Sequence, residues 1–224
     1  MPAIITGWGH CAPPGVLTND DLATIMDTSD EWIQQRTGIK ERRYIEESGI
    51  GASDLAVNAV KMACANAGVD VSEIDAIIFA TLSPDHEFPG SGVFLGDKLG
   101  LAGVPALDIR NQCSGFLYGL RVADAWIRCG MYQRVALVGS EVHSTGIDFS
   151  DEGRDVTVLF GDGAGAMVVE ANEVESFEDG VGICRFGMQL CVGGAWGACE
   201  GEVSPEVESC NGFDDDCDGE TDEG

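Results

Sequence analysis

The stretch VPALDIRNQCSGFLYGLRVADAWIRCG, residues 104–130, decides the fold class. Residues 104–109 form a short apolar run typical of a strand, and residues 113–130 have the pattern of a helix that ends at Gly130. Cys113 lies where the strand gives way to the helix. A strand followed at once by a helix is the repeating unit of α/β proteins, so this stretch predicts an α/β fold.

The same alternation extends over most of the chain. The strands are apolar on both faces, which predicts a mostly parallel or mixed sheet covered by helices. The 3–9 strand, AIITGWG, is expected to end in a glycine turn, and GDGAG at 161–165 to be a turn between packed strands. The predicted strands are 3–9, 75–81, 104–109, 134–141, 155–160 and 164–171, and the predicted helices are 28–38, 53–68, 91–100 and 113–130.

Charge and cysteines divide the 224-residue chain unevenly. The net charge is −27, of which −14 lies in residues 171–224, and five of the nine cysteines lie in the last 41 residues. Periodicity stops after Ala171. We therefore predict a body over 1–171, an acidic linker over 172–180 and a Cys/Asp-rich module over 181–224.

Composition also limits the partners and the compartment. A strongly acidic chain is a poor ligand for nucleic acid or an anionic membrane, so neither is expected as a partner. The apolar runs are shorter than the roughly 18 residues of a membrane span, and the N-terminus lacks the pattern of a signal peptide. The body is expected to be cytoplasmic, whereas the tail has the cysteine density of secreted modules.

Cys113 is the first candidate catalytic residue. At a helix N-terminus, backbone N–H groups and the helix dipole favour an anion, and the thiolate is the nucleophilic form of cysteine. Ser114 and Gly115 leave room for a substrate to approach. The alternative from this local context is an inert buried cysteine that packs as a small hydrophobe.

Three blocks in order resemble β-ketoacyl-acyl-carrier-protein synthase III, a family of the thiolase superfamily. They are TNDDLATIMDTSDEWIQQRTGIKERR (18–43), DIRNQCSGFLYGL (108–120) and RDVTVLFGDGAGAMVV (154–169). The resemblance covers residues from about 4 to 170 and implies the first half of a thiolase-like fold. It implies an acyltransferase that starts fatty-acid synthesis from acyl-CoA and malonyl-acyl carrier protein, with no tightly bound cofactor.

The resemblance assigns roles to individual residues. Cys113 matches the acyl-accepting nucleophile. Trp32 matches the aromatic residue that stacks on the CoA adenine, and Arg154 matches the arginine on the adenine's other face. Arg36 and Thr37 match residues beside the nucleotide. A tryptophan face and a guanidinium plane are suited to hold a flat base between them.

The resemblance also implies a homodimer, in which Phe88 reaches the partner's acyl pocket. The family's catalytic histidine and asparagine belong to a second, homologous half that this sequence does not match. The three histidines, His10, His86 and His143, all lie in the first 143 residues and match no catalytic position. The resemblance therefore implies an incomplete catalytic set. The second half normally packs on a central helix, so that helix is expected to expose Phe116, Leu117, Leu120 and Trp126.

Other interpretations of these residues remain open. The alternative for Trp32 is that it is a core tryptophan. The alternative for Arg36, Arg42 and Arg43 is that they lie at a solvated helix end. The chain as a whole has the alternative of a non-catalytic relic or fusion, whose tail is a secreted Ca²⁺-binding or structural module. A join created by gene fusion or sequence assembly is a third alternative.

The tail carries a candidate metal site. Asp214, Asp216, Asp218 and Asp222 supply hard oxygen ligands near Gly219, as Ca²⁺ loops do, although the pattern matches an EF-hand loop only in part. The tail also resembles Asp/Cys-rich repeats of secreted bacterial proteins that carry a metal-binding motif. The alternative is a solvated acidic end.

Overall fold

The computed structural model describes residues 3–171, 191–192, 195–196 and 206. The chain divides into two compact units, Met1–Asn172 and Glu173–Gly224. In the second unit the described residues form one antiparallel strand pair, β8 (Cys191–Val192) and β9 (Ala195–Trp196). The linker and module predicted at 172–224, with the four aspartates predicted as metal ligands, otherwise lie outside the described residues. No helix in the described part is long and apolar enough to span a membrane.

The first unit is built around a five-stranded sheet in the order β1-β7-β6-β4-β5. Strand β4 lies parallel to β5 and β6, whereas β7 runs antiparallel to both β6 and β1. Of the two sheet types predicted, the mixed sheet is therefore correct. The strands are β1 (Ala3–Cys11), β4 (Ala76–Ala80), β5 (Ala106–Ile109), β6 (Arg134–Glu141) and β7 (Gly163–Ala171).

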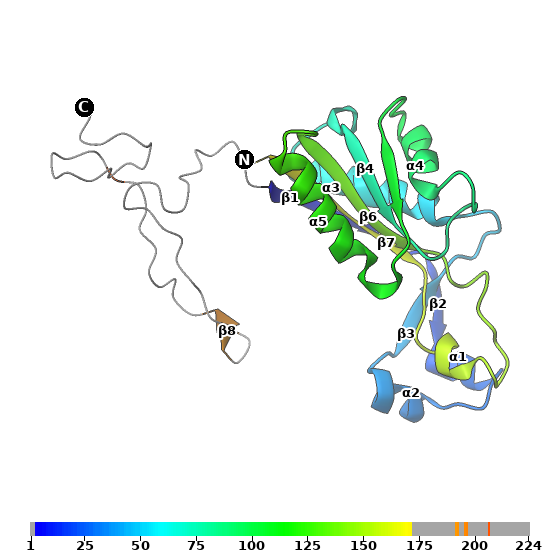
Figure 1. Cartoon of the computed structure of the whole chain (residues 1–224). Helices are drawn as coiled ribbons and strands as arrows, with labels where there is room; N and C mark the ends of the chain where they lie inside the picture. Colours follow the sequence, from blue (N-terminus) through cyan, green and yellow to red (C-terminus); the bar gives the residue numbers. More distant parts are fainter. Residues whose placement is uncertain (1–2, 172–190, 193–194, 197–205, 207–224) are drawn as a thin grey trace, which may run out of the picture. The chain divides into compact units, whose positions relative to one another are not determined.

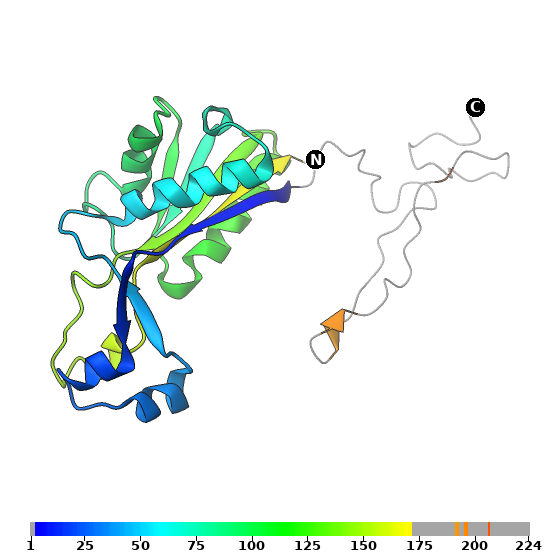
Figure 2. The same ribbon diagram turned by 180° about the vertical axis from the view of Figure 1, so that it is seen from behind.

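Helices cover both faces of this sheet (Figures 1 and 2). Because side chains alternate along a strand, Ile77 and Phe79 of β4 join the core under α3 and α4, and Ile78 joins the core under α5. The predicted helices at 28–38, 53–68 and 91–100 are confirmed, each ending at a glycine with positive φ. The helices are α2 (Asp30–Thr37), α3 (Ala52–Ala67), α4 (Ser91–Leu99) and α5 (Gly115–Arg128).

Strand β1 runs past the glycine turn that the sequence suggested. Gly7 and Gly9 lie inside the strand, on the face that packs against α3. A Cβ on Gly9 would overlap the backbone oxygen of Ala59 and lie 2.5 Å from the backbone nitrogen of Ala63. These glycines therefore allow strand and helix backbones to approach closely, and do not form a turn.

A small lobe below the sheet in Figure 1 holds the paired strands β2 and β3 with helices α1 and α2. The sequence patterns missed β2, β3 and α1, which are each four or five residues long. The elements are β2 (Gly15–Thr18), α1 (Asn19–Ala23) and β3 (Glu41–Tyr44), and the body also has two single turns, η1 (Val71–Glu73) and η2 (Gln112–Ser114).

The strand predicted at 155–160 is wrong. Its first residues belong to the short helix α6 (Arg154–Thr157), and no strand lies between α6 and GDGAG. The turn predicted at 161–165 is wrong as well, because Gly163 to Gly165 are the first residues of β7. Strands β6 and β7 pair directly, with Glu141 opposite Gly163, so residues 142–162 form an excursion between two strands that are already paired. Within this excursion the backbone N–H groups of Thr157 and Val158 donate to the oxygens of Gly153 and Arg154, so a helical turn takes the place of strand pairing.

The exposed face of α5 differs from the prediction. Phe116, Leu120 and Trp126 are half-buried and pack on the sheet, so their predicted exposure is wrong. Leu117 is 63% exposed and Tyr118 is 58% exposed on the outer side of the helix. Trp8 is exposed on β1 and alternates with the glycines that face α3, so it lies on the face of the sheet that α5 covers.

This apolar face should bind the dye ANS, because large exposed apolar side chains create a surface that water solvates poorly. Leu117→Lys should lower the ANS fluorescence of the folded chain. Val93→Lys is the matched control, since Val93 is a comparably exposed residue on α4, the helix that packs on the other face of the sheet. Equal fluorescence in the wild type and the Leu117 variant would contradict the assignment of this face.

Candidate active site

Cys113 lies on the turn between β5 and α5. The turn η2 contains Cys113, and α5 begins two residues later at Gly115, not at the cysteine as predicted. Gln112 has φ +24°, a left-handed conformation that non-glycine residues rarely adopt. Gly115, two residues after Cys113, is buried, and a Cβ there would lie 3.2 Å from the Cβ of Ala80. The turn is therefore tight, and it leaves the Cys113 side chain exposed.

The other described cysteines of the body have different environments. Cys64 is buried, and burial raises the pKa of its thiol, which keeps it in the unreactive protonated form. Cys11 is partly buried. Cys129 is exposed, but its Sγ lies 3.3 Å from the backbone oxygen of Trp126, to which it donates. Exposure thus distinguishes Cys113 from Cys64, and its place before α5 distinguishes it from Cys129.

A second feature gathers four predicted site residues. Trp32, Arg36, Thr37 and Arg154 line one open pocket of about 410 Å³ together with Asp155, Val158 and Leu159. Trp32 and Arg36 follow the cap of α2, where Ser29 Oγ accepts a hydrogen bond from the Trp32 backbone (3.1 Å). Arg154 opens α6. The fold therefore joins residues that are more than 110 positions apart in the sequence.

Two guanidinium groups stack on the same indole ring. The Cζ of Arg36 lies 4.2 Å from the centroid of the Trp32 ring, and the Cζ of Arg154 lies 4.6 Å from it. Arg154 Nη1 also donates to the backbone oxygen of Asp27 (2.8 Å). A flat base between Trp32 and Arg154 requires the guanidinium to move outward by about one ring thickness, roughly 3.5 Å. The pocket is thus positively charged and aromatic in an acidic protein.

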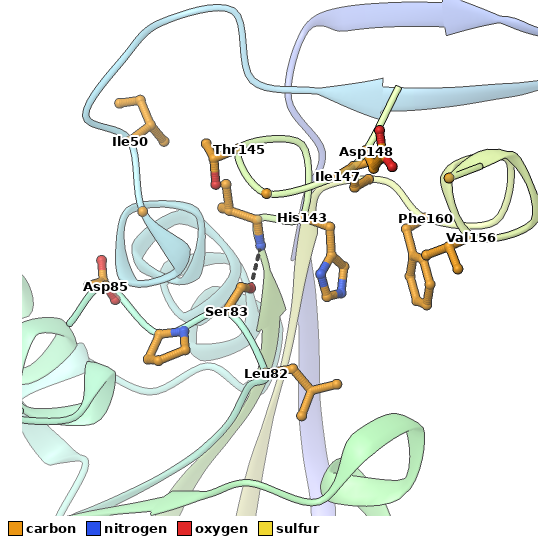
Figure 3. Close-up of a pocket in the computed structure, with 15 residues that line it drawn as sticks. Ile50, Leu82, Ser83, Asp85, His143, Thr145, Ile147, Asp148, Val156 and Phe160 are labelled. Atoms are coloured by element: carbon orange, nitrogen blue, oxygen red, sulfur yellow. Dashed lines mark hydrogen bonds between the residues drawn. The ribbon is translucent and has the colours of Figure 1, made fainter. Parts of the chain in front are cut away.

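A larger pocket of about 640 Å³ lies where β4 and β6 end (Figure 3). His143 lies at its wall, with its ring 4.8 Å from that of Phe160 and its Nε2 3.6 Å from Glu141 Oε2. Ser83 Oγ donates to the same carboxylate (2.6 Å) and accepts from the backbone of Val142 (2.8 Å). The sequence interpretation gave His143 no role.

The position of this pocket could have been anticipated. Strands β4, β5 and β6 are mutually parallel, and ligands of α/β sheets bind beyond the carboxyl ends of such strands. Residues 81–85 and 142–148 follow β4 and β6, and Cys113 follows β5. The pocket and Cys113 therefore share one edge of the sheet.

The remaining predicted site residues lie elsewhere. Phe88 is 90% exposed on the loop between β4 and α4, and it does not line either pocket. The predicted ligands Asp214, Asp216, Asp218 and Asp222 are outside the described residues. Among those that the structure describes, no three histidine, cysteine or acidic side chains gather as metal ligands do.

These features define an α/β protein of the thiolase-like class. The solved structure of 3-oxoacyl-[acyl-carrier-protein] synthase III from Aquifex aeolicus superposes with a TM-score of 0.73 at 41% identity, covering 85% of this chain and 59% of that one. Within the class, residues 107–183 match the family described as 3-Oxoacyl-[acyl-carrier-protein (ACP)] synthase III.

Two curated relatives agree with that family. The chain is 47% identical over 171 residues to β-ketoacyl-[acyl-carrier-protein] synthase III 2 of Vibrio vulnificus, covering 76% of this chain and 46% of the relative. It is 43% identical over 187 residues to the synthase III of Solibacter usitatus, covering 83% and 55%. The chain thus spans about half the length of the curated relatives it matches.

Proposed function

We propose that this chain carries the acyl-accepting site of a 3-oxoacyl-[acyl-carrier-protein] synthase III, with acyl-CoA as donor. The observation that carries the proposal is the convergence of Trp32, Arg36, Thr37 and Arg154 in one pocket. The indole face of Trp32 and the guanidinium plane of Arg154 are suited to hold the adenine between them, and the positive charge of Arg36 is suited to a CoA phosphate.

In the proposed reaction the Cys113 thiolate attacks the thioester carbonyl of acyl-CoA. A bond forms between Sγ and the carbonyl carbon, the bond from that carbon to the CoA sulfur breaks, and CoA leaves with the proton that Cys113 gave up. The pocket at the ends of β4 and β6 provides space for the acyl chain, since it lies on the same edge of the sheet as Cys113.

The partners are part of the same proposal. Acyl carrier protein would receive the acyl group in condensation, and a homodimer would bring the exposed Phe88 of one chain to the acyl pocket of its partner. Condensation also needs residues that activate the malonyl group, and no histidine of this sequence matches that role. Transfer to Cys113 is therefore the step that this chain's own residues support best.

Cys113 should become acylated when the chain is mixed with acetyl-CoA or longer acyl-CoAs. Mass spectrometry of tryptic peptides would show one acyl group on the Cys113 peptide, and Cys113→Ala would abolish it. Cys129→Ala is the matched control, because Cys129 is also exposed. Iodoacetamide at graded pH should likewise label Cys113 before Cys64 and Cys129. Equal acylation or labelling of Cys113 and Cys129 would refute the proposal.

A further inference from the structure

Arg42 is a buried cation that the proposed reaction does not use. Its side chain is on β3 in the small lobe, and the residue is only 5% exposed. Burial lowers the pKa of Arg42, the direction expected for a cation removed from water. Within the described part of the chain, no carboxylate forms a salt bridge with it. Since a buried charge is costly unless it is well bonded, this guanidinium needs an explanation.

The guanidinium donates hydrogen bonds to three acceptors on two segments that are far apart in the sequence. Arg42 Nη1 donates to the backbone oxygen of Leu17 (3.2 Å). Its Nη2 donates to Asn19 Oδ1 (2.9 Å) and to the backbone oxygen of Val158 (3.0 Å). Val158 directly follows α6 and lines the Trp32 pocket. Arg42 therefore binds the segment that carries Arg154.

Asn19 continues this connection toward α2. Asn19 is 1% exposed, and its Nδ2 donates to Asp30 Oδ1 (2.8 Å) and to the backbone oxygen of Ile39 (2.7 Å). Asp30 is the first residue of α2, and its other oxygen accepts from Gln34 Nε2 (2.6 Å). Hydrogen bonds from Asn19 and Gln34 lower the pKa of Asp30, so the carboxylate stays ionised as an acceptor.

A continuous chain of hydrogen bonds thus joins Val158 to Asp30 through Arg42 and Asn19. Val158 belongs to the segment of Arg154, and Asp30 begins the helix of Trp32 and Arg36. Both segments line the Trp32 pocket. Buried bonds of this kind hold their partners in one geometry, because breaking any of them leaves a polar group unpaired.

We propose that Arg42 and Asn19 are positioning residues that hold the segments of Trp32 and Arg154 in place, so that these two side chains can stack on the nucleotide of coenzyme A once the Arg154 guanidinium moves outward. The ligand rests on the proposed function, whereas the positioning of Trp32 can be measured without any ligand. Arginine suits the role since its planar fork reaches several acceptors at once, which the single ammonium of lysine cannot do.

The experiment uses the full chain labelled with 5-fluorotryptophan, which gives ¹⁹F signals from Trp8, Trp32, Trp126 and Trp196. Trp32→Phe assigns the Trp32 signal. Arg42→Met should shift or broaden that signal and leave the signals of Trp8 and Trp126 unchanged. Asn19→Ala, a smaller change, should do the same. Arg134→Met is the matched control, because Arg134 is also multiply bonded, to Glu73 and Glu170, but lies outside the pocket.

Calorimetry with coenzyme A is the second readout. Arg42→Met and Asn19→Ala should each weaken binding by about tenfold, because Trp32 and Arg154 would then have to be ordered when the ligand binds. The Arg42→Lys variant should bind coenzyme A about as weakly as the Arg42→Met variant, since a positive charge alone does not restore the three hydrogen bonds. If the lysine variant bound coenzyme A with wild-type affinity, the positive charge at position 42 and not its hydrogen bonds would account for binding, and the proposal would be overturned.

The two hypotheses fail differently. An unchanged Trp32 signal in folded Arg42→Met and Asn19→Ala would overturn the positioning role, whatever binds in the pocket. Wild-type affinity in these variants, while Trp32→Ala binds coenzyme A weakly, would overturn it too and leave the proposed function standing. If Trp32→Ala leaves the affinity for coenzyme A unchanged, the proposed function fails. The ¹⁹F signals alone then decide whether Arg42 and Asn19 position Trp32.

Discussion

Trp32→Ala should raise the Kd for coenzyme A by about 10- to 100-fold, because stacking of a base on an aromatic side chain contributes about 1–3 kcal/mol. Arg154→Gln should also weaken binding, since Arg154 lies over the same ring. Isothermal titration calorimetry with coenzyme A measures both effects.

Trp8→Ala serves as the control for this prediction. Trp8 is an exposed tryptophan on β1 and does not line the pocket, so its removal should leave the Kd unchanged. Equal affinity in the wild type and the Trp32 variant would show that the pocket does not bind the nucleotide. It would also favour the alternative that Trp32 is a structural tryptophan.

Gly9→Ala should destabilise the first unit by about 3 kcal/mol or more, a large share of the roughly 5–15 kcal/mol that stabilises a typical domain. The added Cβ would overlap the backbone oxygen of Ala59, which cannot rotate away as a side chain does. Strand β1 and helix α3 would have to separate and lose their packing. Urea unfolding followed by circular dichroism measures the change.

Gly165→Ala is the matched control for Gly9→Ala. Gly165 lies on the neighbouring strand β7 opposite His10, and a Cβ there meets no atom within 4 Å. That variant should stay within about 0.5 kcal/mol of the wild type. If both glycine variants unfold at the same urea concentration, close approach of β1 and α3 does not limit stability.

The order of the longer helices and strands in the body could be predicted, because each of them depends on local chemistry. Gly38, Gly68 and Gly100 end three helices at positive φ, a conformation that glycine adopts at low cost. The strand at β4 is apolar on both faces, and all five of its residues are buried. Local patterns failed at 155–160, where the alternation suits a strand but the backbone forms the short helix α6 in the excursion between the paired strands β6 and β7.

The residues of the candidate site could be predicted from the sequence, but their arrangement in space could not. The blocks around Trp32, Cys113 and Arg154 named the residues, but nothing in their spacing places two guanidinium groups on one indole. The hydrogen-bond chain through Arg42 gave no local signal, because its partners come from segments up to 116 residues apart. The pocket of His143 could be anticipated only from its place after parallel strands, and not from its own residues.

By itself the sequence determined the α/β class, the ends of most helices, the cysteine on the turn after β5 and the acidic, cysteine-rich character of the tail. Only the tertiary structure decided that the sheet is mixed, that Phe116 packs inward while Leu117 is exposed, and that Arg42 joins two segments that line one pocket. The reason is physical. Helix ends and turns depend on the conformational preferences of neighbouring residues, whereas strand direction, burial and buried hydrogen bonds depend on which distant segments meet.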